Sequence, residues 1–141
     1  MRRIEILSLV VGVVLLGASG CSTQNKSDAD ALQGTWKGQE MGAHTEGTCS
    51  LVVSGKDLEF HGANSNEWYK ATFTLREDTN PKQLLGTITE CPAAKYVGKS
   101  SCAIYQLEGG ALTLAALGPG NPAVPSSFEA AGVRRFVFKG K

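Results

Sequence analysis

Hydrophobic and polar residues alternate along short segments from residue 34 to the end of the chain. The clearest run places Tyr69, Ala71, Phe73 and Leu75 at every second position, with polar residues between them. A period of two puts successive side chains on opposite faces of a β-strand. Segments of this kind predict eight strands, at residues 35–39, 49–54, 57–62, 68–76, 84–91, 102–108, 111–116 and 133–139.

Turn residues separate these segments, as in SGKD at 54–57, DTNP at 78–81 and EGG at 108–110. The short spacing leaves no room for crossover helices, so neighbouring strands are expected to be antiparallel. One face of the sheet is apolar and must be buried, and eight strands can close into a barrel, which also removes exposed edges. We therefore predict an all-β fold, a single small up-and-down antiparallel β-barrel of about eight strands. An eight-stranded sandwich with the same faces is the alternative.

A short helical turn is expected before the first strand. Ser27 or Asp28 can cap one turn that ends at Leu32.

The apolar face of the predicted barrel suggests a binding role. An eight-stranded barrel is wide enough either to be filled by side chains or to hold one small ligand. We expect a small apolar or amphipathic ligand. The inward side chains that could line its site are Phe60, Tyr69, Phe73, Ile88, Tyr105, Leu107, Leu114, Phe136 and Phe138.

The first 20 residues have the order of a secretory leader. Arg2 and Arg3 form a basic start, residues 6–16 are mainly apolar, and residues 17–20 are all small. A helix over residues 6–16 would span about 16 Å, roughly half a bilayer core. We therefore predict a leader at residues 1–20 rather than a membrane-spanning helix.

The end of this leader, Ala18-Ser19-Gly20-Cys21, resembles the lipobox of bacterial lipoproteins. The resemblance implies that Cys21 is lipidated and that the chain is anchored to a membrane in the cell envelope. Ser22 stands where an aspartate would indicate inner-membrane retention in enteric bacteria, which favours the periplasmic face of the outer membrane. An ordinary leader with a chance cysteine is the alternative. Residues 21–31 are then the lipidated cysteine and a polar, flexible tether, and residues 32–141 are the barrel domain.

Charge gives no sign of a nucleic-acid partner. Removing the two arginines and one glutamate of the leader leaves twelve basic and twelve acidic side chains. The one basic pair outside the leader is Arg134-Arg135, which is too little for a nucleic-acid surface.

Three cysteines remain after the leader, and export to an oxidising compartment makes one disulfide plausible. If Cys91 and Cys102 face each other across a hairpin, Ile88 falls opposite Tyr105, and the apolar faces agree. We therefore predict a Cys91–Cys102 disulfide, with Cys49 free. Pairing of Cys49 with Cys91 or Cys102 is the alternative.

Catalytic and metal-binding motifs are missing from the sequence. It has no Gly-x-Ser-x-Gly elbow, no His-Glu-x-x-His pair and no phosphate-binding glycine loop. His44 and the three cysteines are of types that bind zinc, but no close Cys-x-x-Cys pair exists. We therefore expect neither an enzyme nor a cofactor nor a metal site.

Several short motifs, in their order along the chain, resemble a known group of domains. They are LQGTWK at 32–37, NPK at 80–82, AIYQLEGGAL at 103–112, PGNP at 119–122, PSSF at 125–128 and VFK at 137–139. The resemblance is to a family of small, uncharacterised, lipocalin-like domains common in Planctomycetes and Verrucomicrobia. It implies a lipocalin-like barrel and no established activity.

Gly34-Thr35-Trp36 also resembles the glycine–x–tryptophan motif of lipocalins. The resemblance implies that Trp36 closes one barrel end and that an arginine of the last strand stacks on its ring. Arg134 is the matching residue, because it shares a face with Phe136 and Phe138. Such a cation–π contact is worth about 0.5–2 kcal/mol.

The sequence therefore favours a lipid-anchored cell-envelope protein with a lipocalin-like barrel that binds a small ligand. The alternative is a non-catalytic module of the protein-interaction or inhibitor type, displayed on the envelope. In that case the loops at 40–48, 61–67 and 92–101 would carry the function.

Overall fold

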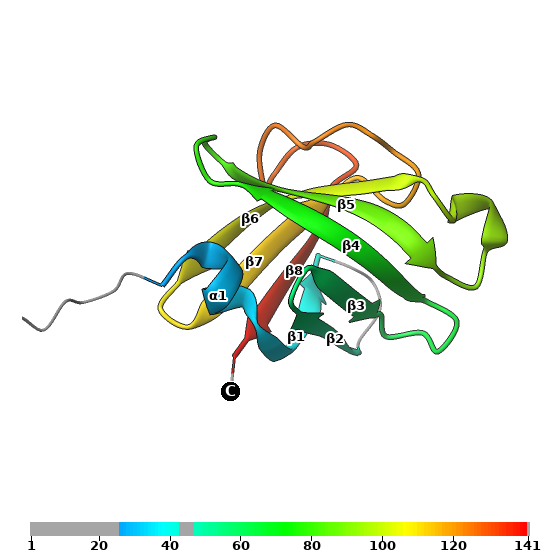
Figure 1. The fold of residues 1–141 in the computed structure, drawn as a ribbon, viewed down its shortest axis with the longest axis horizontal. Helices are drawn as coiled ribbons and strands as arrows, with labels where there is room; N and C mark the ends of the chain where they lie inside the picture. The colour runs from blue at the N-terminus through cyan, green and yellow to red at the C-terminus, as the bar shows by residue number, and fades with distance from the viewer. Residues whose placement is uncertain (1–25, 43–46, 141) are drawn as a thin grey trace, which may run out of the picture.

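The computed structural model describes residues 26–42 and 47–140, and within them the chain forms a closed, up-and-down antiparallel barrel (Figure 1). The predicted fold class is confirmed. A helix, α1 (Asp28–Leu32), precedes eight strands, and a short 3-10 helix, η1 (Ala94–Tyr96), lies between the fifth and sixth. The strands are β1 (Gly34–Met41), β2 (Thr48–Ser54), β3 (Asp57–His61), β4 (Trp68–Arg76), β5 (Lys82–Glu90), β6 (Ser100–Glu108), β7 (Ala111–Ala116) and β8 (Arg134–Lys139).

Each strand pairs with the next, and β8 pairs with β1 to close the ring. The predicted leader, residues 1–20, and Cys21 lie outside the described residues. Within residues 26–42 and 47–140, no helix has the length and apolar character needed to cross a membrane.

The two ends of the barrel differ in their side chains. The turns 55–56, 77–81 and 109–110 lie at one end, here called the closed end, and the loops 62–67, 91–99 and 117–133 lie at the other, the open end. The half of the barrel next to the closed end is here called the closed half, and the other half the open half. Large inward side chains fill the closed half, among them Trp36, Phe73, Tyr105 and Phe138. The largest fully buried aromatic side chains of the core therefore lie in the closed half.

Helix α1 covers the closed end (Figure 1). The Ser27 side chain accepts a hydrogen bond from the Asp30 amide at 3.2 Å, and this cap starts the helix. Leu32 is buried in the core, and its carbonyl accepts a bond from the Trp36 indole at 2.9 Å. The predicted helical turn is confirmed, and residues 28–31, which lie within the predicted tether, form α1 together with Leu32.

Asp28 joins α1 to the barrel through its carboxylate. Its Oδ2 accepts hydrogen bonds from Lys82 Nζ and from the Tyr105 hydroxyl, both at 2.8 Å. Burial raises the pKa of Asp28, but the bonds from Lys82 and Tyr105 outweigh this effect, and the pKa lies below its ordinary value. Burial, and then the bond to Asp28, raise the pKa of Tyr105.

We predict that Asp28→Ala lowers the free energy of unfolding by about 1–3 kcal/mol, because it leaves the buried Tyr105 hydroxyl without its acceptor. The loss in the free energy of unfolding should reach its full size above about pH 4, the ordinary pKa of aspartate. It should shrink as the pH falls through the lower pKa that Asp28 has in the folded protein. Urea unfolding at several pH values measures both effects. Asp30→Ala is the matched control, because Asp30 lies in the same helix and is exposed. An equal loss in both variants would contradict the role of Asp28.

The register of β5 and β6 differs from the prediction. Leu85 lies opposite Cys102 and Lys82 opposite Tyr105, so the strands are displaced by six residues from the register that faces Cys91 with Cys102. Cys91 instead lies beyond β5, where its thiol donates to the Ala93 carbonyl at 3.0 Å. The predicted Cys91–Cys102 disulfide is therefore wrong in this structure, in which Cys49, Cys91 and Cys102 are all free. A displacement by an even number of residues keeps every side chain on its face, so alternation alone does not exclude it.

Candidate functional site, a cavity in the open half of the barrel

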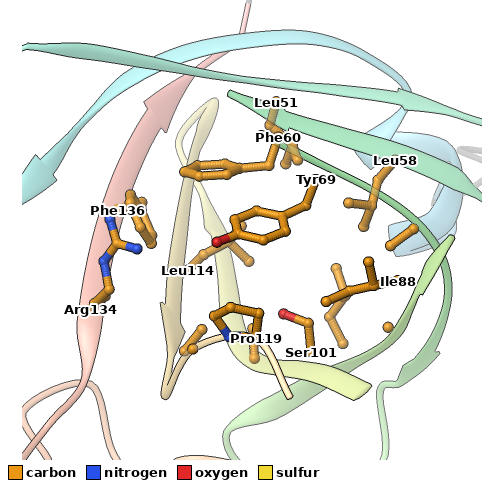
Figure 2. A pocket seen from close by; sticks show the side chains of 16 residues that line it. Leu51, Leu58, Phe60, Tyr69, Ile88, Ser101, Leu114, Pro119, Arg134 and Phe136 are labelled. Carbon is orange, nitrogen blue, oxygen red and sulfur yellow. The ribbon is translucent and has the colours of Figure 1, made fainter. Parts of the chain in front are cut away.

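A cavity of about 100 Å³ lies inside the open half of the barrel (Figure 2). Its apolar lining comes from seven of the eight strands and the start of the 117–133 loop. These side chains are Leu51, Leu58, Phe60, Ala71, Leu84, Ile88, Ala103, Leu114, Ala116, Pro119 and Phe136. Three lining residues carry polar groups, namely Tyr69, Ser101 and Arg134.

Small inward side chains create this space. Where the closed half has Phe73 and Tyr105, the same strands have Ala71 and Ala103 in the open half, and β5 has Gly86. Protein interiors are otherwise packed as densely as organic crystals, so a row of small residues leaves a real void. The cavity is smaller than the apolar cavity of about 150 Å³ that holds benzene. It therefore has room for a short alkyl segment. The rest of a longer molecule would extend out of the cavity at the open end of the barrel, here called its mouth.

Five of the nine side chains predicted as possible ligand contacts line this cavity, namely Phe60, Tyr69, Ile88, Leu114 and Phe136. The other four do not. Phe73, Tyr105 and Phe138 are buried in the closed half, and Leu107 packs against that core. They face inward as predicted, but they lie too far along the barrel axis.

An ion-pair cluster of Glu40, Glu67 and Arg134, here called the mouth triad, stands at the open end. The Arg134 guanidinium forms a bidentate pair with Glu40, from Nε to Oε1 at 2.8 Å and from Nη2 to Oε2 at 2.9 Å. Its Nη1 lies 2.5 Å from Glu67 Oε1, an ion pair without hydrogen-bond geometry. The bond from Arg134 holds the pKa of Glu40 below its ordinary value, and the carboxylates raise the pKa of Arg134.

The predicted stacking of Arg134 on Trp36 is wrong. Because β8 runs antiparallel to β1, Trp36 lies beside the end of β8, and Arg134 lies at its start. Gly140 packs against the Trp36 indole instead, where an added Cβ would be 3.2 Å from a ring carbon. Gly34 begins β1 at the closed end of the barrel, and it has a positive φ of 114°. Arg134 stacks on Phe136, with 5.2 Å between the guanidinium carbon and the ring centroid.

A tight turn brings Glu67 to the mouth triad. The Gly62 amide donates to the Glu67 carbonyl at 2.8 Å, and the Glu67 amide donates to the Asn64 carbonyl at 2.9 Å. The Glu67 side chain folds back over Gly62, where an added Cβ would come within 2.7 Å of the carboxyl carbon. Gly62 therefore leaves the space through which Glu67 reaches Arg134.

Two hydroxyl groups face the cavity. Figure 2 shows the Tyr69 ring projecting into it, with the hydroxyl directed toward Leu114 and Pro119, and the Ser101 side chain on the side of Pro119. Neither hydroxyl forms a hydrogen bond within the part of the chain that the structure describes. Burial raises the pKa of Tyr69, so its phenol is protonated at neutral pH.

Cys49 is a buried inward residue of β2, opposite Gly38. Burial raises the pKa of its thiol, and the nearby carboxylates of Glu40 and Glu67 add to the effect. A thiol with a raised pKa is a poor nucleophile at neutral pH. Within residues 26–42 and 47–140, no three His, Cys, Asp or Glu side chains form a group that could hold a metal ion.

Comparisons with protein-family models, with curated proteins and with solved structures find no match to this chain. What the structure establishes about the class of this protein is therefore its architecture, a small eight-stranded antiparallel barrel with an apolar cavity at one end.

Sequence reasoning did not place Glu40, Glu67 and Ser101 at the cavity, and it included them only within the loops 40–48, 61–67 and 92–101 of the protein-interaction alternative. Glu40 and Ser101 do carry a signal, because they are polar residues at inward positions of β1 and β6. Glu67 carries none, since it lies in a turn and reaches the site only through the fold.

Proposed function

We propose that this protein is a lipid-anchored cell-envelope protein whose barrel holds a small apolar or amphipathic molecule in its open half. The observation that supports binding is the cavity, which is apolar apart from Tyr69, Ser101 and Arg134. Binding sites for small molecules generally combine an apolar concavity with a few polar groups that orient the ligand. The resemblance to lipocalin-like domains agrees with the barrel architecture and implies no activity of its own.

The sequence alone supports the anchoring part of the proposal. The leader at 1–20 and the lipobox-like segment that ends at Cys21 favour lipidation, and Ser22 favours the periplasmic face of the outer membrane. Stable anchoring would follow from acylation on both the sulfur and the new amino terminus, because one acyl chain gives only marginal membrane binding.

The position of α1 adds an orientation to this proposal. Five residues lie between Cys21 and Ser27, and α1 covers the closed end of the barrel. A segment of this length reaches at most about 20 Å, so the closed end would stay near the membrane. The mouth of the cavity would then open away from the bilayer, and a ligand would enter from the aqueous side.

Filling the cavity tests the binding proposal. We predict that Ala71→Phe weakens the binding of 1-hexanol to the purified protein by about tenfold or more, because each buried CH₂ contributes about 0.8 kcal/mol. The measurement is a titration followed by ¹⁵N NMR, with native mass spectrometry to detect any molecule retained from the cell. Ala116→Leu, nearer the mouth, is a second filling variant in case Ala71→Phe disturbs the fold.

Ala123→Phe is the matched control, because residue 123 is exposed in the 117–133 loop and does not line the cavity. It should leave hexanol binding unchanged. If the unmodified protein shows no saturable shift at cavity residues and retains no molecule, the binding proposal fails.

A protein-interaction module is the second candidate function, and an open groove on the outside of the barrel favours it. The groove lies across β4, β5 and β6, and Pro122 and Val124 of the 117–133 loop border it. Lys56 and Arg76 line it, and no carboxylate is among its described lining residues, so it suits an acidic protein surface. Under this candidate, Arg76→Glu would abolish capture of a partner from envelope extract, and Ala71→Phe would not.

A further inference from the structure

The charge of Arg134 is already neutralised before any ligand enters the cavity. Glu40 binds two of the guanidinium nitrogens, at 2.8 and 2.9 Å, and Glu67 contacts the third at 2.5 Å. Every nitrogen of the guanidinium therefore faces a carboxylate oxygen. Two acids and one base give the mouth triad a net charge of −1.

This arrangement disfavours a ligand with an anionic head. A carboxylate at the mouth would find no free pair of guanidinium nitrogens for the bidentate contact that arginine normally offers. It would also be repelled by Glu40 and Glu67, while it lost its own hydration.

A cationic head meets a different obstacle. The charged residue that lines the described cavity is Arg134, and neither Glu40 nor Glu67 lines it. An ammonium group inside would find no carboxylate among the lining residues to accept its hydrogen bonds, because the oxygens of Glu40 and Glu67 already contact Arg134. The net charge of −1 at the open end would offset only part of the cost of removing the ammonium charge from water.

Neutral hydrogen-bonding groups have partners in the cavity. The hydroxyls of Tyr69 and Ser101 face it, and each can both donate and accept a hydrogen bond. Figure 2 shows both among the apolar side chains and on the side of the cavity where Pro119 lies.

We infer that the cavity selects a neutral amphipathic molecule, with its alkyl end among the apolar side chains and a hydroxyl, carbonyl or ester oxygen at Tyr69 or Ser101. A fatty acid or alkylamine of the same length binds more weakly. This inference depends on the proposed ligand-binding function and adds the chemical class of the ligand.

Three probes with the same alkyl chain test this inference, namely 1-hexanol, hexanoate and hexylamine at neutral pH. Titrations of the purified protein followed by ¹⁵N NMR should give a dissociation constant for 1-hexanol at least about tenfold lower than for either ion. In a Glu40→Gln, Glu67→Gln double variant, Arg134 has no counter-charge. Hexanoate should then bind about tenfold more tightly than to the unmodified protein.

Glu108→Gln is the control, because it removes one negative charge at the closed end, where Glu108 bonds to Gln106. It should leave all three affinities unchanged. Tyr69→Phe should weaken 1-hexanol binding by about threefold to tenfold.

The outcomes separate this inference from the proposed function. If hexanoate or hexylamine binds the unmodified protein as tightly as 1-hexanol, the neutral-ligand inference is overturned and cavity binding stands. If none of the three probes gives saturable shifts at cavity residues, the ligand-binding function itself fails. The ranking in the unmodified protein decides the question even if the double variant does not fold.

Discussion

Replacing Gly38 with alanine should destabilise the barrel by about 3 kcal/mol or more, at the upper end of the range for overpacking substitutions. Gly38 lies on β1 opposite Phe138 of β8, at the pairing that closes the ring. A Cβ at this position would come within 2.0 Å of the Val137 carbonyl oxygen and 2.7 Å of the Phe138 Cα. Both are backbone atoms, so the strain cannot be relieved by rotating a side chain, and the β1–β8 pairing must shift.

Urea unfolding measures the loss in the free energy of unfolding, and amide hydrogen exchange shows which strands are affected. Exchange should rise most along β1 and β8, because the substitution acts at their pairing. Gly42→Ala is the matched control, since Gly42 has a φ of 76° but no atom within 4 Å of an added Cβ. Gly42→Ala should lower the free energy of unfolding by about 1 kcal/mol, because of the backbone conformation alone. If Gly38→Ala costs no more than the control, the close approach of the two strands does not limit the fold.

Phe138→Ala should have the second large effect, a loss of about 3–5 kcal/mol in the free energy of unfolding. Phe138 is fully buried, at 0% exposure, and belongs to the core of the closed half. Removing its ring leaves a cavity that the closed ring of strands cannot collapse to fill. Thermal or urea unfolding measures the loss.

Phe60→Ala is the matched comparison, because it removes the same ring from the open half. Phe60 is half-buried and lines the existing cavity, so its removal enlarges a space that is already open. It should cost clearly less than Phe138→Ala, and it should change ligand binding, whereas the effect of Phe138→Ala is on stability. Equal losses of stability would contradict the division between a core half and a binding half.

This division explains how so small a barrel can have both a core and a cavity. Trp36, Phe138 and the buried Leu32 of α1 complete the closed half. The open half has Ala71, Ala103 and Ala116, and it therefore has space. The stability of the fold and the selectivity of the cavity depend on different residues, so each can be changed separately.

The alternation of side chains predicted the strands well. The segments predicted at 68–76 and 111–116 coincide with β4 and β7, and the inward positions of Phe73 and Tyr105 are those of the structure. These predictions succeed because the side-chain period of a strand is a local property of the backbone.

The predictions that failed concern position along the strands. The register of β5 and β6 preserves the faces but is displaced by six residues, and this separates Cys91 from Cys102. Arg134 faces inward with Phe136, yet it lies at the opposite end of the barrel from Trp36. In both cases the alternation of side chains predicted the correct face of the sheet. It did not predict the position of the residue along the barrel axis.

The sequence by itself determined the number of strands, the inward face of the alternating apolar side chains and the short helical turn that ends at Leu32. It did so because a two-residue period, turn residues and a capping serine act over a few neighbouring positions. Only the tertiary structure decided which end of the barrel each inward residue occupies, which partners Arg134 has and where the cavity lies. These depend on strand registers and on packing between distant segments, and an even shift of register leaves the local pattern unchanged.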